Sequence, residues 1–252
     1  MTKIKNPAQI FLSKLSILEY KYRILESNEE CFNIFTALHK QKDEVHLHSR
    51  FLSVLLSPNG LHNKGDLFLR LFLNVIEIKD FDTNQSEVIP NEFNKSEYNE
   101  IDIFIVNRIK KQAIIIENKI DAGDSNHEDK GQLEGYFNLV QQIEKISKDN
   151  IKVIYLTLDG HEPTPASLGK YSTLENMNGR TIDYEHEIIN WLNLCLKECS
   201  KQPFLRESII QYQNLIQHMT NIPDIKECLE IRDLIANSED NLKSAKLLID
   251  NF

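Results

Sequence analysis

The sequence contains little of what marks several protein classes. Only 8 glycines and 7 prolines occur among 252 residues, and 41% of the chain is hydrophobic. Collagen-like, mucin-like and wholly disordered chains are therefore excluded. No uninterrupted apolar run approaches the roughly 20 residues of a membrane-spanning helix. Residues 1–9 are polar and lack the apolar core of a secretory signal, so we expect a cytoplasmic protein without a membrane anchor.

Cysteine is also scarce. The four cysteines, Cys31, Cys195, Cys199 and Cys228, form neither a CxxC pair nor a dense disulfide framework. We therefore expect buried, reduced thiols. Cys195 and Cys199 lie four residues apart, but no neighbouring His or Cys completes a zinc site.

Basic residues are too few for a nucleic-acid-coating protein. The chain has 29 Lys and Arg against 38 Asp and Glu, a formal net charge of -9. This balance argues against a protein that covers DNA non-specifically with a basic surface. It does not exclude an enzyme that touches a polyanion at one site.

The periodicity of apolar residues predicts an α/β fold. Helical spacing occurs at residues 8–26, 29–41, 45–56, 66–78, 128–146, 188–196, 203–219 and 223–248. Strand-like segments occur at 86–93, 100–106, 112–120 and 151–158, and residues 171–174 and 181–184 are short strands or extended loop. We expect a mixed sheet of four to five strands with helices on both faces. The predicted division is an N-terminal helical extension (1–40), a core (41–200) and a C-terminal helical extension (201–252), together forming one compact unit.

Two carboxylates are predicted to face each other in a hairpin of this sheet. If Val106 pairs with Ala113, antiparallel register places Asp102 opposite Glu117. Opposed carboxylates on an apolar sheet are destabilising unless a shared proton, a cationic side chain or a divalent cation compensates.

The same register predicts the orientation of Lys119, Asn118 and Glu100. Side chains alternate along a strand, so Lys119 lies on the same face as Glu117, whereas Asn118 points away. Glu100 would lie opposite Lys119. Carboxylate ligands favour Mg²⁺ or Mn²⁺ over zinc, and a hard cation beside a lysine suits phosphoryl chemistry. The alternative is a solvated sheet edge, with Glu117 and Lys119 as an exposed ion pair.

The pattern of Asp102 followed by Glu117-x-Lys119 resembles the PD-(D/E)xK nuclease superfamily. Gln132 and Tyr136 then follow as Gln-x(3)-Tyr, which is similar to a motif of the RecB-like and phage-exonuclease branches. Upstream, Glu44-x(3)-His48-Ser49 is similar to the first core helix of a bacterial group in that superfamily. The resemblance covers about residues 40–195. It implies a restriction-endonuclease-like core. One departure is Ile101, which stands where the name-giving Pro would precede Asp102.

The resemblance also implies a role for each matching residue. Glu44, Asp102 and Glu117, together with the backbone carbonyl of Asn118, would bind the metal, and Lys119 would be the catalytic lysine. Gln132 and Tyr136, four residues apart on one helix face, would brace the site or contact phosphate.

Other residues near these motifs are weaker candidates. His48, one helical turn from Glu44, could orient that carboxylate, and the alternative is a surface or capping histidine. Ser49 and Arg50 could support the site or contact substrate, and Glu100 could be an extra ligand or a partner of Lys119.

A basic cluster connects the two strands of the hairpin. Arg108, Lys110 and Lys111 could lie along a nucleic-acid backbone, and a solvated hairpin tip is the equally good alternative. The acidic residues after Lys119, namely Asp121, Asp124, Glu128 and Asp129, lack EF-hand spacing and are predicted to form a loop.

These expectations combine into one leading function and two alternatives. The leading function is an Mg²⁺-dependent deoxyribonuclease, with DNA and a role in bacterial defence suggested by the resemblance alone. The first alternative is a nuclease fold that has lost its chemistry and serves as a binding or regulatory module. The second is an RNA-cleaving toxin that uses the same site. The terminal helices could mediate a homodimer or bind a partner protein that gates activity.

Overall fold

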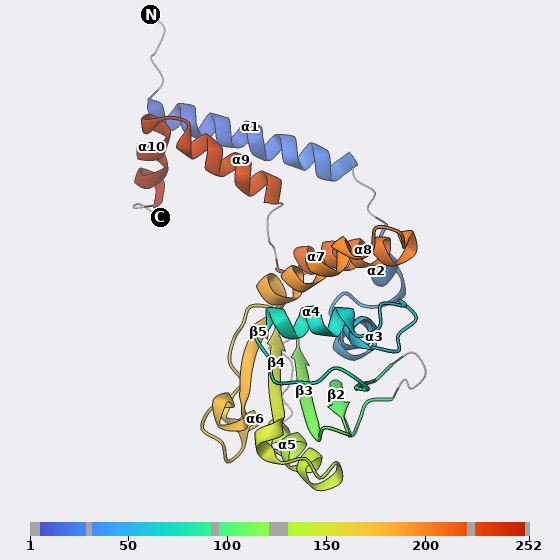
Figure 1. The fold of residues 1–252 in the computed structure, drawn as a ribbon. Coiled ribbons are helices and arrows are strands. Elements are labelled where there is room, and N and C mark those ends of the chain that lie inside the picture. Colours follow the sequence, from blue (N-terminus) through green and yellow to red (C-terminus); the bar gives the residue numbers. More distant parts are fainter. Residues whose placement is uncertain (1–5, 29–31, 92–95, 121–130, 221–224, 250–252) are drawn as a thin grey trace, which may run out of the picture. The chain divides into compact units, whose positions relative to one another are not determined.

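The computed structural model describes residues 6–28, 32–91, 96–120, 131–220 and 225–249 (Figure 1). The chain divides into two compact units, one formed by residues 1–32 with 221–252 and the other by residues 33–220. The domain boundaries expected from the sequence stay predictions. Among the helices in the described ranges, none combines the length and apolar character that crossing a membrane requires.

The larger unit is built on a mixed five-stranded sheet, as predicted. Its strands are β1 (Glu87–Ile89), β2 (Ile103–Asn107), β3 (Gln112–Lys119), β4 (Ile151–Thr157) and β5 (Gly179–Asp183), and they lie side by side in that order. The first three strands are antiparallel, and β4 and β5 run parallel to β3.

The sequence left residues 171–174 and 181–184 open between short strands and extended loop. The segment near residue 181 is part of β5. By contrast, the segment from residue 171 is loop that leads into a short 3-10 helix, Leu174–Met177. Of the strand predicted at 86–93, three residues form β1, and residues 92–93 lie outside the described residues.

The hairpin register predicted from the sequence is confirmed. Val106 pairs with Ala113, and the ladder continues to Ile103 paired with Ile116. Beyond that pair the chain leaves the ladder, because Asn99 and Glu100 adopt positive φ angles of 50° and 67°. The predicted pairing of Glu100 with Lys119 is therefore not formed.

Each face of the sheet is covered by its own hydrophobic cluster. Ile114 and Ile116 of β3 point to one cluster, and Ala113 and Ile115 point to the other, so this central strand is buried on both sides. The first cluster contains α3 (Arg50–Leu56), α4 (Leu67–Val75), α7 (Ile189–Lys197) and α8 (Pro203–Thr220), and short α2 (Ile34–Leu38) packs against it. The second contains α5 (Gln132–Ile143) and the short helix α6 (Pro165–Leu168).

Two wide helical turns lie on the side of the first cluster. The helix predicted at 45–56 begins with a π-helical turn, η1 (Glu44–Ser49), before it continues as α3. Asp43 caps this turn by accepting the His46 backbone N–H at 2.9 Å. A second π-helical turn, η4 (Tyr184–Ile188), precedes α7. Single π-turns are often associated with functional sites.

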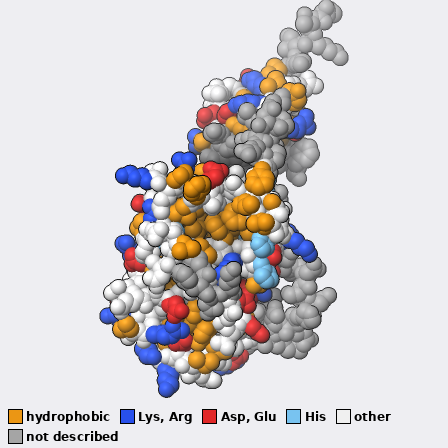
Figure 2. Space-filling model, turned by 90° about the vertical axis from the view of Figure 1, so that its right-hand side faces the viewer, with side chains coloured by type: hydrophobic (Ala, Val, Ile, Leu, Met, Phe, Trp, Pro, Cys, Tyr) orange, Lys and Arg blue, Asp and Glu red, His pale blue; other side chains and the backbone are white. Residues whose placement is uncertain are grey.

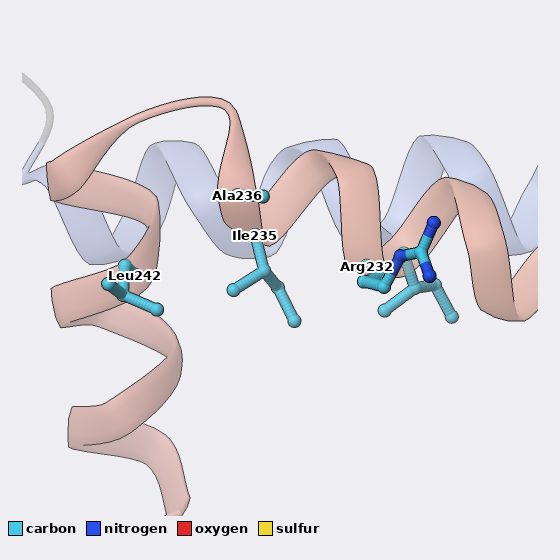
Figure 3. Close-up of a pocket in the computed structure, with 5 residues that line it drawn as sticks. Arg232, Ile235, Ala236 and Leu242 are labelled. Atoms are coloured by element: carbon cyan, nitrogen blue, oxygen red, sulfur yellow. The ribbon is translucent and has the colours of Figure 1, made fainter.

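The smaller unit consists of helices from both ends of the chain. Helix α1 (Pro7–Asn28) packs with α9 (Ile225–Ala236) and α10 (Glu239–Ile249). Lys21 of α1 forms an exposed ion pair with Glu230 of α9, with 2.6 Å between nitrogen and oxygen. Figure 3 shows a shallow apolar pocket of this unit, lined by Ile231, Arg232, Ile235, Ala236 and Leu242.

Several predictions concern cysteines and loops. Cys195 and Cys199 are buried free thiols, as expected. Cys31, the side chain of Cys228 and the predicted acidic loop after Lys119 lie outside the described residues.

The core of the larger unit depends on aromatic side chains such as Phe137 of α5, which is 1% exposed. Phe137→Ala should lower the free energy of unfolding by about 3–5 kcal/mol, because it removes buried apolar contacts and leaves a cavity. Urea denaturation followed by the fluorescence of the single tryptophan, Trp191, measures this unit. The control is Phe204→Ala, at a site 90% exposed, which should change the value by no more than about 0.5 kcal/mol. Equal effects of the two substitutions would contradict this packing.

Candidate active site

The site lies where β2 begins and β3 ends, on the face covered by α5. Glu117 is 1% exposed and Asp102, immediately before β2, is 8% exposed. Asp102 accepts the backbone N–H of Asn118 through Oδ2 at 2.7 Å. This hydrogen bond holds Asp102 beside the strand end that carries Glu117, one position beyond the last ladder pair. The solvated sheet edge considered as an alternative does not exist here, because both carboxylates are buried.

Lys119 lies on the same face as Glu117, as the alternation of side chains predicts. Its Nζ is 3.0 Å from Oε1 of Glu117, and its side chain is about one quarter exposed, at 24%. The other oxygen of Glu117, Oε2, is buried and has no hydrogen-bond partner. A buried carboxylate oxygen without a partner is rare, since the lost hydration is normally replaced.

A third carboxylate approaches from the π-helical turn η1. Glu44 accepts the backbone N–H of Ile120 through Oε2 at 3.0 Å. This bond ties η1 to the residue that follows Lys119. Glu44 also acts electrostatically on Asp102 and Glu117, since its charge disfavours theirs.

Burial and mutual repulsion shift the pKa values of these groups. Burial raises the pKa of Asp102 to about 7, with Glu97 and Glu44 adding to the rise and the Asn118 N–H and Lys119 opposing it. Burial, followed by the charge of Asp102, raises the pKa of Glu117 well above its ordinary range. Burial alone would lower the pKa of Lys119, but the charges of Glu117, Glu44 and Asp102 raise it overall.

These features fit a hard divalent cation. Desolvated carboxylates that repel one another, one of them with an unpartnered oxygen, are stabilised by positive charge between them. Within the described ranges, however, no three His, Cys, Asp or Glu side chains are already converged as a metal-binding set. Glu44 and Asp102 each give one oxygen to a backbone N–H instead. Metal binding by Glu44, Asp102, Glu117 and the Asn118 carbonyl stays a prediction.

Gln132 and Tyr136 of α5 lie next to this group. Gln132 donates through Nε2 to the Tyr136 hydroxyl at 2.9 Å, and that hydroxyl donates to the Glu100 carbonyl at 2.6 Å. The pair therefore braces the turn that leads into Asp102. Burial and the charge of Glu117 raise the pKa of Tyr136, which keeps its hydroxyl a donor at neutral pH.

Glu100 does not have the pairing with Lys119 considered from the sequence, and the neighbouring Glu97 acts on Asp102. The exposed Glu100 contributes its backbone carbonyl to the Tyr136 contact, and Lys119 pairs with Glu117 rather than with Glu100. Glu97, which sequence reasoning missed, disfavours the charge of Asp102 and has a buried oxygen, Oε1, without a hydrogen-bond partner. Burial raises the pKa of Glu97. Its only sequence signal is an acidic residue five positions before Asp102.

The residues that follow Glu44 have different partners from those predicted. Both ring nitrogens of His48 are engaged away from Glu44: Nε2 lies 2.8 Å from the Gln41 carbonyl and Nδ1 lies 2.9 Å from the Tyr212 hydroxyl. Of the two alternatives for His48, orientation of Glu44 is therefore wrong, and so is a surface position, because the side chain is fully buried. Ser49 accepts a hydrogen bond from Asn118. Arg50 is partly buried at the start of α3, and its contact with substrate stays a prediction.

The basic cluster in the hairpin connection is engaged by acidic groups and by backbone. Arg108 donates through Nε and Nη2 to Glu144, both at 3.0 Å, and through Nη1 to Glu87. Lys111 donates to the Glu144 carbonyl at 3.0 Å, and Lys110 lies 3.7 Å from Asp82. The cluster adjoins Gln112 at the opposite end of β3 from Lys119, roughly 20 Å along the strand.

The face shown in Figure 2 agrees with this distribution of charge. Lys, Arg, Asp and Glu side chains are interspersed there, and the described residues form no continuous basic area on that face. Nucleic-acid binding by Arg108, Lys110 and Lys111 stays a prediction.

The site therefore combines two buried carboxylates with a lysine at the end of the central strand of a mixed α/β sheet. A model of the PD-(D/E)XK nuclease superfamily matches residues 32–214, which is more than half of the chain. The chain therefore belongs to this superfamily. The matched region nearly coincides with the sheet-containing unit, residues 33–220. Comparisons with curated proteins and with solved structures found no match.

Membership confirms the resemblance to the superfamily, and the α/β fold is confirmed with it, whereas the motif roles of Asp102, Glu117 and Lys119 stay predictions. It indicates a nuclease, and nucleases of this superfamily generally use divalent metal ions and act on nucleic acid. The bacterial group and the Gln-x(3)-Tyr branch stay predictions.

The raised pKa of Asp102 makes stability depend on pH. The folded, metal-free protein binds more protons than the unfolded chain between about pH 4 and about pH 7, so the free energy of unfolding should fall as pH rises through that window. Asp102→Asn should reduce this fall and should be more stable than wild type at pH 8. Urea denaturation in EDTA at several pH values, followed by Trp191 fluorescence, measures both.

The matched control is Asp149→Asn, which neutralises an exposed carboxylate in the same unit and should leave the wild-type pH profile in place. If Asp102→Asn is less stable than wild type at pH 8, folding favours the charged form of Asp102. That result would contradict the raised pKa of Asp102 in the folded protein.

Proposed function

We propose that the protein is a metal-dependent nuclease that hydrolyses phosphodiester bonds of DNA. The observation that carries the proposal is the buried Glu117. One of its oxygens pairs with Lys119 and the other has no partner, although Asp102 lies beside it. A chain of the PD-(D/E)XK nuclease superfamily has a chemical reason to keep such a group.

The residues that would hold the cation are Glu44, Asp102, Glu117 and the backbone carbonyl of Asn118. An all-oxygen set favours Mg²⁺ or Mn²⁺. When bound, such a cation makes water more acidic and neutralises charge that develops on a phosphoryl group.

Lys119 would act through the positive charge and the hydrogen-bond donors of its ammonium group. It is paired with Glu117 at 3.0 Å and retains a partly exposed ammonium group. A charged ammonium donates hydrogen bonds, so Lys119 would orient the attacking water or stabilise the charge on the phosphate, rather than remove a proton.

Gln132 and Tyr136 would maintain the position of Asp102. Their hydrogen bonds fix the carbonyl of Glu100, two residues before Asp102. Because Tyr136 donates its proton to that carbonyl, its contribution is orientation of the chain.

The alternative of a binding module without chemistry has a specific weakness. Two desolvated carboxylates, whose pKa values are raised by burial and by neighbouring acidic groups, destabilise the folded protein in the absence of a cation. A module that only binds would be more stable with neutral side chains at these positions. The RNA-cleaving alternative uses the same site, and the substrate comparison below separates it from a deoxyribonuclease.

Further parts of the hypothesis remain separate proposals. These are DNA rather than RNA as substrate, a role in defence against foreign DNA, a cytoplasmic location, a homodimer, and a partner protein that gates activity.

Asp102→Ala and Lys119→Ala should each reduce cleavage by at least about 100-fold, because each removes a group that acts on the reacting phosphate or on the cation. Supercoiled plasmid, linear duplex DNA and RNA are incubated with Mg²⁺, with Mn²⁺ or with EDTA. Nicking of the plasmid distinguishes internal cleavage from degradation that begins at ends.

The control is Lys152→Ala, a lysine of β4 that pairs with Asp80 near the hairpin end of the sheet, and it should retain wild-type activity. Wild-type activity of Asp102→Ala would remove the site assignment. Absence of metal-dependent cleavage of every substrate by the wild-type protein would favour the binding module, and selective cleavage of RNA would favour the toxin.

A further inference from the structure

A buried polar network lies on the face of β3 opposite to Glu117 and Lys119. Its centre is Asn118, which is 1% exposed and lies between those two residues in the strand. The carboxamide of Asn118 is used at both ends. Tyr184 donates its hydroxyl to Oδ1 at 3.0 Å, and Nδ2 donates to the Ser49 hydroxyl at 3.0 Å.

A second branch of the network anchors the residue next to Ser49. His48 is fully buried, and burial lowers its pKa to about 4, so the ring is neutral. Its Nε2 must donate to the Gln41 carbonyl, which can only accept. Nδ1 is therefore the acceptor, and the Tyr212 hydroxyl donates to it at 2.9 Å.

The two branches meet at the tyrosines. Tyr184 and Tyr212 have no exposed surface, and each uses its hydroxyl proton in one of the hydrogen bonds above. The His48 ring packs against both, with ring centroids 5.7 Å and 5.6 Å apart. Phenylalanine would fill the same core volume without the need to satisfy a hydroxyl group. The hydroxyl groups therefore serve the polar network rather than the packing.

The network is joined to the carboxylates through the backbone. The peptide N–H of Asn118 donates to Asp102, and the N–H of Ile120, two residues later, donates to Glu44. Glu44 belongs to the same π-helical turn, η1, as His48 and Ser49. The end of β3 and the turn η1 both position acidic groups. Each is held on the opposite face of the sheet by hydrogen bonds that lead to a tyrosine hydroxyl group.

We propose that Tyr184 and Tyr212 are positioning residues of the nuclease site: Tyr184 fixes Asn118 and, through it, Ser49, whereas Tyr212 fixes η1 through His48, so that Glu44, Asp102 and Glu117 stay in register. This inference rests on the proposed nuclease function for its kinetic consequence only. The register itself is a property of the folded chain and can be measured without a substrate.

Tyr184→Phe removes one oxygen and leaves the Asn118 Oδ1 without its donor. We expect faster amide hydrogen exchange in residues 117–120, weaker binding of Mn²⁺ measured by electron paramagnetic resonance, and a kcat at least about 10-fold lower with KM for DNA unchanged. A displacement of reacting groups by about 1 Å can reduce a rate by about 100-fold. Ser49→Ala interrupts the network at its other end, removes a single oxygen, and should give the same three changes.

The matched control is Trp191→Phe. It also removes a buried hydrogen bond in the same hydrophobic cluster, from the indole N–H to the Phe68 carbonyl at 2.9 Å, but this bond has no link to Asn118 or η1. Trp191→Phe should lower thermal stability to a similar extent and leave exchange in residues 117–120, Mn²⁺ binding and kcat at wild-type values.

The outcomes separate the two hypotheses. A wild-type protein that cleaves nucleic acid, together with Tyr184→Phe and Ser49→Ala variants that match Trp191→Phe in exchange and in kcat, would overturn the positioning role. A wild-type protein that cleaves nothing would overturn the nuclease function alone. In that case faster exchange and weaker Mn²⁺ binding in the two variants, but not in Trp191→Phe, would still establish the positioning role.

Discussion

The constraint on which the rest of the site depends is the burial of Glu117 beside Asp102. Each carboxylate loses its hydration, and the two charges repel, so the charged pair opposes folding. The compensation within the protein is partial: an ion pair from Lys119 to one Glu117 oxygen and one backbone N–H to Asp102. The two fully buried hydrophobic clusters around the sheet supply the stability that tolerates this strain. A bound cation would offset this repulsion. The carboxylate oxygens that are electrostatically unfavourable are therefore the same atoms that the proposed chemistry would use to bind the metal.

The pleat of a single strand separates chemistry from support. Glu117 and Lys119 point to the face of α5, and Asn118, between them, points into the opposite cluster. A strand carries both sets only because its side chains alternate. Lys119 can therefore keep a partly exposed side chain beside the buried Glu117, while Asn118, the residue between them, is held by Tyr184 and Ser49.

How far the sequence predicts this arrangement depends on the range of the contacts. Alternation and apolar runs are local, so the hairpin register, with Val106 opposite Ala113, follows from the sequence. The turn at Glu100 could not be predicted, because positive φ angles are typical of Gly and, less often, of Asn, whereas Glu rarely adopts them. The bond of His48 to Tyr212 joins residues 164 positions apart, and no spacing rule reaches that distance. Similarly, the partner of Arg108, Glu144, lies on a different element.

The two ends of β3 show why net charge is a poor guide to this site. At the hairpin end, Arg108 and Lys110 face Glu144, Glu87 and Asp82, so charges are balanced in ion pairs. At the other end, Glu97 and Glu44 raise the pKa of Asp102, Asp102 and Glu44 raise the pKa of Glu117, and Lys119 lowers both pKa values. The formal charge of -9 is the sum over the whole chain and contains neither fact. A nuclease site is therefore compatible with an acidic chain. The excess of negative charge lies where a divalent cation would be bound, and a phosphate could approach those carboxylates once the cation has neutralised them.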